Sequence, residues 1–136
     1  MKKMRADITK YLIEKLNPSF IILFGSFANG THREESDLDL AFYPKEGFDP
    51  PTPYKIFMIS QDLAHKFKRE VDLVNLKTVS TVFKAQIYAT GDLLFSENKN
   101  LFAHQQMTAL SMYAKLNEER KNILDKINER GSIYEK

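Results

Sequence analysis

Short hydrophobic runs alternate with amphipathic stretches along the first hundred residues. Apolar side chains recur about four residues apart between Met4 and Leu16, which predicts a helix that Asn17-Pro18 ends. The next apolar run, Phe20 to Phe24, is short, rich in branched residues and bounded by Pro18 and Gly25, which favours a strand buried on both faces. The pattern therefore predicts a helix followed by a central strand.

The residues after this strand predict a turn and a second strand. The segment that follows Gly25 up to Asn29-Gly30 has the length of a single helical turn. In residues 37–43 acidic and apolar positions alternate before the run becomes apolar, as in a strand whose first half lies at a surface. Because too few residues join these strands for a parallel crossover, we expect the pair to be antiparallel or to belong to a mixed sheet. Four of the five prolines fall in residues 44–53, which predicts a loop.

The remaining pattern predicts two more strands and at least three helices. Apolar residues at helical spacing mark residues 54–69 and 79–87, and we expect Gly91 to end the second helix as a C-terminal cap. Residues 71–76 form a third strand and residues 93–95 a short edge strand. No Gly or Pro occurs between residue 100 and about residue 130, which indicates one long helix or two shorter ones. The fold class is α/β (α+β), a small mixed β-sheet with flanking helices.

Size and composition indicate one domain. A chain of 136 residues and 15.8 kDa leaves no room for a second core of normal size, so we expect a single domain over residues 1–136. Its core should occupy about residues 18–96 and a C-terminal helical extension about residues 100–131. The longest purely apolar run, Phe20 to Phe24, is too short to span a bilayer, so no membrane partner is expected.

Cysteine content and charge exclude several classes of protein. The absence of cysteine excludes a disulfide scaffold, a thiolate zinc site and a catalytic thiol. The first residues, Met-Lys-Lys-Met-Arg, lack the apolar stretch of a secretory signal, so we expect a cytoplasmic protein. A net charge of +2 does not indicate direct nucleic-acid binding. Locally, however, four of the six residues from Glu34 to Asp39 are acidic.

Three aspartates are candidate metal ligands. Asp37 and Asp39 lie two residues apart on a predicted strand, so both side chains should leave the same face and repel each other unless a cation lies between them. Oxygen ligands without His or Cys favour Mg²⁺ or Mn²⁺ over zinc. Asp72 would join the pair if its strand is the neighbouring one, and three carboxylates could then hold two metal ions that activate an attacking oxygen. The alternatives are a solvated acidic strand start and, for Asp72, a surface acid on an edge strand.

Gly25 and Ser26 are candidate phosphate-binding residues. A Gly directly after a buried strand lets a ligand approach the backbone, and a Ser that opens a helical turn presents its hydroxyl and nearby N–H groups to an anion. An ordinary helix cap is the alternative for this Ser. A basic cluster at Lys66, Lys68 and Arg69 could steer a triphosphate, although a solvated helix end is the simpler interpretation. No P-loop and no dinucleotide fingerprint occurs.

The spacing of these residues resembles a known signature. Gly25-Ser26, ten intervening residues and then Asp37-Leu38-Asp39 are similar to the Gly-Ser-x10-Asp-x-Asp signature of the DNA polymerase β-like nucleotidyltransferase superfamily. At residue frequencies of roughly 5–7%, chance gives this spacing in on the order of one such chain in a thousand. Within the superfamily the chain resembles the minimal nucleotidyltransferases (MNT proteins) between about residues 20 and 95. The stretches that carry this resemblance are Gly25-Ser-Phe-Ala-Asn-Gly30, Ser36-Asp-Leu-Asp-Leu40 and Val71-Asp-Leu-Val74. The family often has Arg at the position of Asn29.

The resemblance implies a role for each candidate residue. Asp37 and Asp39 would bind the metals that hold the triphosphate, and Asp72 would complete the second metal site and help deprotonate an acceptor hydroxyl. Gly25 and Ser26 would contact the β and γ phosphates. The implied cofactor is Mg²⁺, as two ions, with Mn²⁺ as an alternative. The implied reaction is transfer of AMP from ATP to a hydroxyl with loss of pyrophosphate.

The resemblance also implies a partner. Many stand-alone MNT proteins pair with a HEPN-family toxin, and antitoxins of this kind adenylylate a tyrosine of the toxin. We therefore expect an adenylyltransferase that acts as the antitoxin of a HEPN pair. The alternatives are a small-molecule acceptor such as an aminoglycoside, and a non-catalytic antitoxin that neutralises its partner by contact. The apolar stripe of Leu116, Ile123 and Ile127 could be core, a homodimer face or a partner-binding face.

Overall fold

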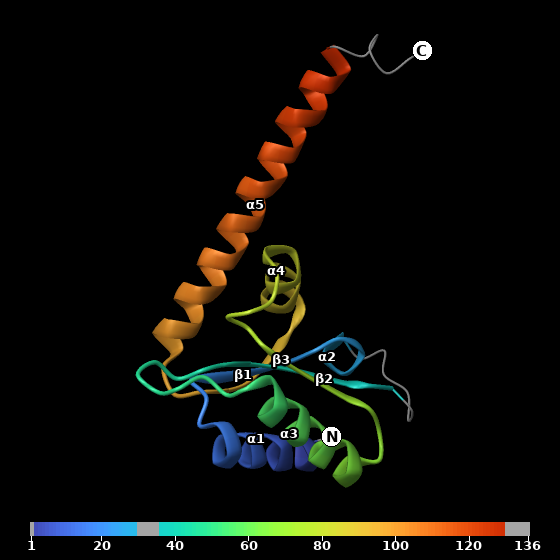
Figure 1. Cartoon of the computed structure of the whole chain (residues 1–136), viewed down its shortest axis with the longest axis vertical. Helices are drawn as coiled ribbons and strands as arrows, with labels where there is room; N and C mark the ends of the chain where they lie inside the picture. The colour runs from blue at the N-terminus through green and yellow to red at the C-terminus, as the bar shows by residue number, and fades with distance from the viewer. Residues whose placement is uncertain (1, 30–35, 130–136) are drawn as a thin grey trace.

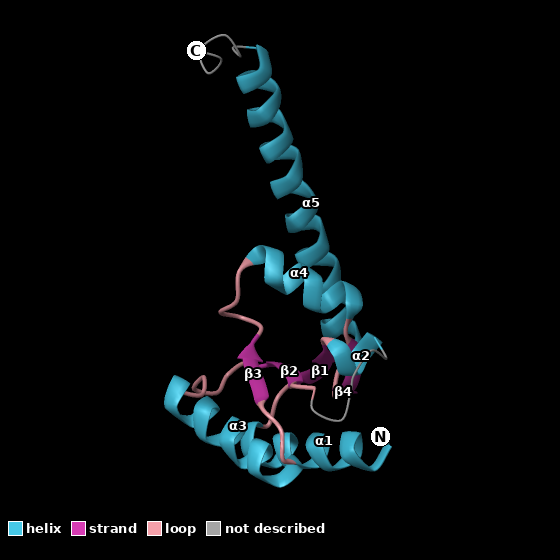
Figure 2. Cartoon of the chain, turned by 90° about the vertical axis from the view of Figure 1, so that its right-hand side faces the viewer, coloured by secondary structure: helices cyan, strands magenta, loops and turns pink. Residues whose placement is uncertain are grey.

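The protein is a four-stranded mixed sheet with helices on both faces (Figures 1 and 2). The computed structural model describes residues 2–29 and 36–129. The elements in chain order are α1 (Lys2–Leu16), β1 (Phe20–Phe24), α2 (Ser26–Asn29), β2 (Leu38–Tyr43), α3 (Pro53–Phe67), β3 (Val71–Asn75), α4 (Thr81–Thr90), β4 (Asp92–Ser96) and α5 (Lys99–Glu129). The strand order is β3-β2-β1-β4. β1 is antiparallel to β2 and β4, and β2 is parallel to β3, so the predicted antiparallel first pair and mixed sheet are confirmed.

Side chains of β1 fill the core on both faces of the sheet. Ile21 and Leu23 pack with residues of α1 and α3 on one face, whereas Phe20 and Ile22 pack with residues of α4 and α5 on the other. All four are at most 1% exposed, which confirms a central strand buried on both faces. Figure 2 shows the corresponding layers, with α1 and α3 below the sheet and α4 and α5 above it.

Local signals in the sequence set the ends of the helices. The Thr52 hydroxyl accepts a hydrogen bond from the Lys55 N–H at 3.1 Å, and Pro53 occupies the first turn of α3. In the same way the Ser80 hydroxyl accepts from the Phe83 N–H at 3.2 Å at the start of α4. These caps stabilise two helices that the sequence predicted.

Gly91 ends α4, but its role differs from the predicted one. Its φ of −81° and ψ of 160° are extended, not the left-handed conformation of a glycine cap. A Cβ at this position would instead overlap the Ile22 side chain and the Ile87 carbonyl oxygen. Close packing of the turn on β1 therefore requires the glycine.

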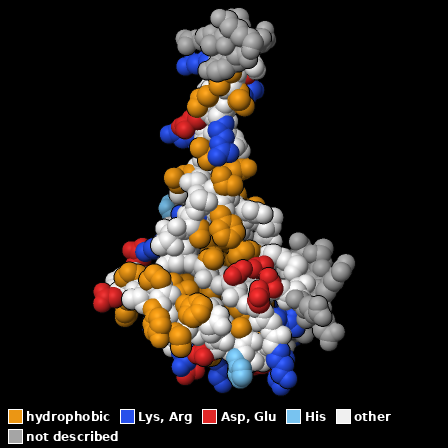
Figure 3. All heavy atoms as spheres, turned by 45° about the vertical axis from the view of Figure 1, so that its right-hand side comes forward, with side chains coloured by type: hydrophobic (Ala, Val, Ile, Leu, Met, Phe, Trp, Pro, Cys, Tyr) orange, Lys and Arg blue, Asp and Glu red, His pale blue; other side chains and the backbone are white. Residues whose placement is uncertain are grey.

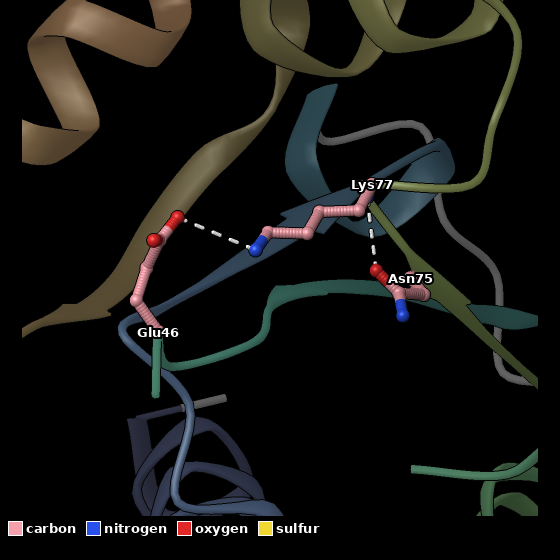
Figure 4. Close-up of polar contacts among 3 residues, drawn as sticks. All are labelled: Glu46, Asn75 and Lys77. Atoms are coloured by element: carbon pink, nitrogen blue, oxygen red, sulfur yellow. Dashed lines mark hydrogen bonds and ion pairs between the residues drawn. The ribbon is translucent and has the colours of Figure 1, made fainter. Parts of the chain in front are cut away.

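The proline-rich loop of residues 44–52 is tied to the rest of the fold (Figure 4). Lys77 Nζ lies 3.4 Å from Glu46 Oε1, and the Lys77 N–H donates to Asn75 Oδ1 at 2.9 Å. Lys45 Nζ forms a second ion pair, at 2.9 Å from Glu97 Oε2. These contacts connect the loop to the turn after β3 and to the segment that leads into α5.

α5 is one continuous helix of 31 residues, which decides between the two arrangements that the sequence left open. Asn98 Oδ1 accepts from the N–H groups of Asn100 and Leu101 at its start. Its first half packs on α4, with Ala109 buried, whereas residues 117–129 are all exposed. Figure 1 shows this second half extending away from the sheet. No helix in the described part of the chain combines the length and the apolar character needed to cross a membrane.

Candidate active site

Two of the candidate aspartates face each other across neighbouring strands. In the parallel register of β2 and β3, Asp39 lies opposite Asp72. Leu38 and Leu40 of β2 are buried in the core on the α1 and α3 side, so Asp39 between them points to the opposite face. Asp72 is therefore both an acid on an edge strand and the direct neighbour of Asp39.

The three candidate carboxylates act on one another electrostatically. Partial burial is the largest cause that raises the pKa of Asp39 to about 6, and the negative charges of Asp72 and then Asp37 raise it further. A hydrogen bond between the carboxyl groups of Asp39 and Asp72 adds to the effect. Asp37 precedes β2 by one residue and, like Asp72, is exposed. On the face shown in Figure 3, acidic side chains gather beside hydrophobic ones.

The turn after β1 lies against this carboxylate group. Phe24, the last residue of β1, is in register with Asp39, and Gly25 follows with a φ of 73°. The positive φ favours glycine, and a Cβ at Gly25 would overlap the Asp39 carboxylate, which would then have to move. Ser26 then opens α2, the predicted helical turn. The structure therefore brings Gly25 and Ser26 next to the aspartates.

Arg69 has a role that its place in a basic cluster did not reveal. Its guanidinium lies over the Phe27 ring of α2, 4.9 Å from the ring centroid. Its Nη1 atom donates to the Ser36 carbonyl oxygen at 3.4 Å. Arg69 thus connects the start of β3 to α2 and to the residue before Asp37, whereas the sequence suggested a solvated helix end. No local signal could have shown this, because the contacts join segments more than thirty residues apart.

The donor set fits a hard divalent cation. Within residues 2–29 and 36–129, no three His, Cys, Asp or Glu side chains form a ready-made metal cage. Burial and then the neighbouring charges of Asp72 and Asp37 raise the pKa of Asp39 to about 6, so its charged form is disfavoured without a cation. A cation between carboxylate oxygens would replace this repulsion with attraction, and such oxygens are the ligands that Mg²⁺ prefers. Glu34 and Glu35 of the predicted acidic cluster lie outside the described residues.

The chain belongs to the polymerase beta nucleotidyltransferase family. The model of this family, described as polymerase beta nucleotidyltransferase, matches residues 6–100, which include all four strands and the candidate site. The protein is therefore a nucleotidyltransferase, a class of enzyme that takes a nucleotide substrate and usually a divalent metal. The fold class predicted from the sequence is confirmed as well.

Within this family, the chain is similar to protein adenylyltransferases. The chain is 34% identical over 109 residues to the protein adenylyltransferase MntA of Shewanella oneidensis, covering 79% of this chain and 74% of the relative. A toxin–antitoxin crystal structure with AMP-PNP contains a chain that matches with a TM-score of 0.76 and 31% identity, over 90% of this chain and 97% of that one. The structure of a tri-AMPylated Shewanella oneidensis HEPN toxin with its MNT antitoxin matches with a TM-score of 0.74 and 27% identity, over 93% and 97% of the two chains. The resemblance to MNT proteins is confirmed.

Proposed function

We propose that this protein is a Mg²⁺-dependent adenylyltransferase that transfers AMP from ATP to a hydroxyl of a HEPN-family toxin and so acts as its antitoxin in the cytoplasm. The observation that carries the proposal is the group formed by Asp39 on β2, Asp72 on β3 and Asp37 just before β2, which adjoins the glycine turn after β1. This arrangement suits the reaction because negative oxygens that would bind a metal lie beside a turn whose backbone N–H groups could bind phosphate.

The side chains would divide the work of nucleotidyl transfer. Asp37, Asp39 and Asp72 would hold two Mg²⁺ ions, which supply the positive charge that offsets the triphosphate. Asp72 accepts the proton of the acceptor hydroxyl as its oxygen attacks the α phosphorus. The bond from this phosphorus to the bridging oxygen breaks, and pyrophosphate leaves. The N–H groups and hydroxyl of Gly25 and Ser26 hold the β and γ phosphates in line with the attack.

A protein acceptor suits the architecture better than a small molecule. In the described part of the chain, residues after Leu101 belong to one straight helix and build no second domain around the site. An acceptor with its own fold needs no such domain. The comparisons support the same choice, since one relative is a protein adenylyltransferase and another was solved with a tri-AMPylated toxin. We also propose that residues 1–136 form one nucleotidyltransferase domain, with its core at about 18–96 and a helical extension at about 100–131.

Labelled ATP tests the proposal. The protein is incubated with α-labelled ATP, Mg²⁺ and a HEPN-family toxin, and label on the toxin is measured. We expect transfer by the natural protein, a loss of at least a thousandfold in the Asp37→Asn, Asp39→Asn double variant, and no change in Asp49→Asn, which removes an exposed loop acid. Absence of transfer by the natural protein contradicts the proposal. Equal protection of cells by the double variant would show neutralisation by contact instead.

A further inference from the structure

A groove runs along the outer edge of β3 and leads to Asp72. Its volume is about 660 Å³, and it is lined by β3, by the first half of α3 and by prolines of the preceding loop. We propose that this groove binds the acceptor segment of the partner toxin as an extended strand and presents its tyrosine to Asp72. The inference rests on the proposed function and assigns the acceptor side of the same site.

The edge of β3 offers backbone groups to an added strand. β3 is the last strand of the sheet on this side, and no described residue pairs with its outer edge. The Leu38 N–H donates to the Glu70 carbonyl at 2.9 Å, and the Leu76 N–H donates to the Phe42 carbonyl at 3.0 Å. Because peptide groups alternate in direction along a parallel strand, those of Val71 and Leu73 point outward. An extended segment can therefore pair with them, as in recognition by strand addition.

The groove includes Asp72, one of the proposed catalytic residues. Asp72 lines the groove and is also the neighbour of Asp39 in the β2–β3 register. A segment paired with β3 passes beside this carboxylate, so one of its side chains can reach the attacking position. Asp72 is the group that would take the proton of the acceptor hydroxyl. The position of the groove thus matches the acceptor and not the nucleotide, whose phosphates would lie on the Gly25 side.

The chemistry of the lining also favours an apolar, uncharged occupant. Phe57 is 57% exposed and, with Ile56 and the loop prolines, gives an apolar wall. No Lys, Arg or His occurs among the described residues that line the groove, and Asp72 adds a negative charge. An anionic ligand such as a nucleotide would therefore be repelled. Because side chains alternate along a strand, a segment that places its tyrosine beside Asp72 places the next side chain against the α3 wall, where an apolar residue packs well.

The walls of the groove are already ordered. Pro51 and Pro53 restrict the backbone on either side of the Thr52 cap, and the Glu46–Lys77 ion pair holds the loop near the end of β3 (Figure 4). A preformed site loses little conformational entropy when it binds its ligand. Its volume also falls in the range of pockets that enclose small organic ligands, about 300–1,000 Å³, which is room enough for side chains of a bound segment.

A matched pair of variants on α3 tests the groove. Phe57 and Met58 are adjacent, apolar and exposed to 57% and 42%, but only Phe57 lines the groove. We expect Phe57→Glu to raise the KM for the toxin at least tenfold, with kcat and the KM for ATP changed less than twofold. Met58→Glu should change none of these values by more than twofold. Equal effects of the two variants, or no effect of Phe57→Glu, overturn the proposal.

Photo-crosslinking gives a readout that does not require transfer. Benzoylphenylalanine is placed at residue 57 or at residue 58, and each protein is irradiated with the toxin in the presence of AMP-PNP. We expect residue 57 to crosslink to a toxin peptide that contains the modified tyrosine, and residue 58 to give at most a tenth of that yield. A crosslink to a second copy of this chain, or to another part of the toxin, overturns the groove. If the natural protein transfers no AMP, the proposed function fails, while the crosslink still decides whether the groove binds the toxin.

Discussion

At the scale of single residues, the site combines features that stability alone would not select. Asp39 is half-buried beside two other carboxylates, and its raised pKa shows that its charged form is disfavoured in the folded, metal-free protein. The same carboxylate occupies the space that a side chain at Gly25 would need. Both features hold negative oxygen beside a backbone turn, which serves a metal and phosphate site at a cost in stability.

The pH dependence of the stability of Asp39→Asn, compared with that of the natural protein, should reveal how much the Asp39 charge destabilises the fold. A folded pKa of about 6, above the ordinary 3.8, means that the folded protein binds this proton more tightly than the unfolded chain does. The free energy of unfolding therefore falls as the pH rises from about 4 through about 6. We expect Asp39→Asn to have the higher Tm at pH 8 in EDTA, and the difference to shrink toward pH 4.

Magnesium and a control variant make this measurement specific. Added Mg²⁺ should raise the Tm of the natural protein at pH 8 and reduce the advantage of Asp39→Asn, because the cation offsets the repulsion. Asp49→Asn, on an exposed loop, should show no such dependence. Parallel Tm profiles of the natural protein and Asp39→Asn across this pH range would contradict a raised pKa of Asp39 in the folded protein.

Alanine variants of two glycines with similar φ values can distinguish the cost of backbone strain from the cost of side-chain overlap. Gly25 and Gly47 have φ values of 73° and 85°, but a Cβ at Gly47 would meet no atom within 4 Å. Gly47→Ala should therefore cost only the left-handed conformation, about 1–2 kcal/mol in the free energy of unfolding. Gly25→Ala should cost more and also abolish AMP transfer, since the Asp39 carboxylate must move. Urea unfolding and the transfer assay measure both effects, and equal costs would rule out the overlap.

At the scale of the elements, local patterns account for most of what was predicted. Periodicity and apolar runs predicted the strands and the longer helices, because burial of one face or of both leaves its own spacing in the sequence, whereas the short helix α2 was predicted from the length of its segment alone. β2 begins at Leu38, so Asp37 lies just outside the strand to which it was assigned. The extended conformation of Gly91 was not predictable, because Ile22 of another element excludes a side chain there.

The N-terminal cap of α3 offers a test at this scale. Thr52→Ala removes the hydroxyl that accepts from the Lys55 N–H and should lower the free energy of unfolding by about 1 kcal/mol. Thr52→Ser keeps the hydroxyl and should stay within a few tenths of a kcal/mol of the natural protein. Urea unfolding compares the three proteins. If both variants lose the same stability, the cap does not stabilise α3.

At the scale of the whole molecule, the second half of α5 stands apart from the sheet. Residues 117–129 are exposed throughout, and the apolar side chains Ile123 and Leu124 are exposed to 58% and 59%. The stripe that the sequence left open between core and interface is therefore not core in this part of the helix. A helical segment that buries nothing adds little stability, because short isolated helices are marginal in water.

Truncation after Leu116 tests this view of α5. We expect the free energy of unfolding to change by less than about 0.5 kcal/mol, because residues 117–129, the described part of the removed segment, are all exposed. Urea unfolding of the full and shortened chains measures it, and circular dichroism confirms that only helix signal from the removed segment is lost. A loss above about 1 kcal/mol would show that the end of α5 stabilises the fold.

The sequence by itself determined the elements and one half of the site. Apolar spacing defines helices and strands locally, and the ten residues between Gly25-Ser26 and Asp37 join two antiparallel strands whose ends must meet. Only the tertiary structure decided that β3 pairs with β2, which sets Asp72 opposite Asp39. The same pairing leaves a groove at the free edge of β3 and lets Arg69 reach α2. Strand order depends on packing between distant segments, and no local pattern of residues records it.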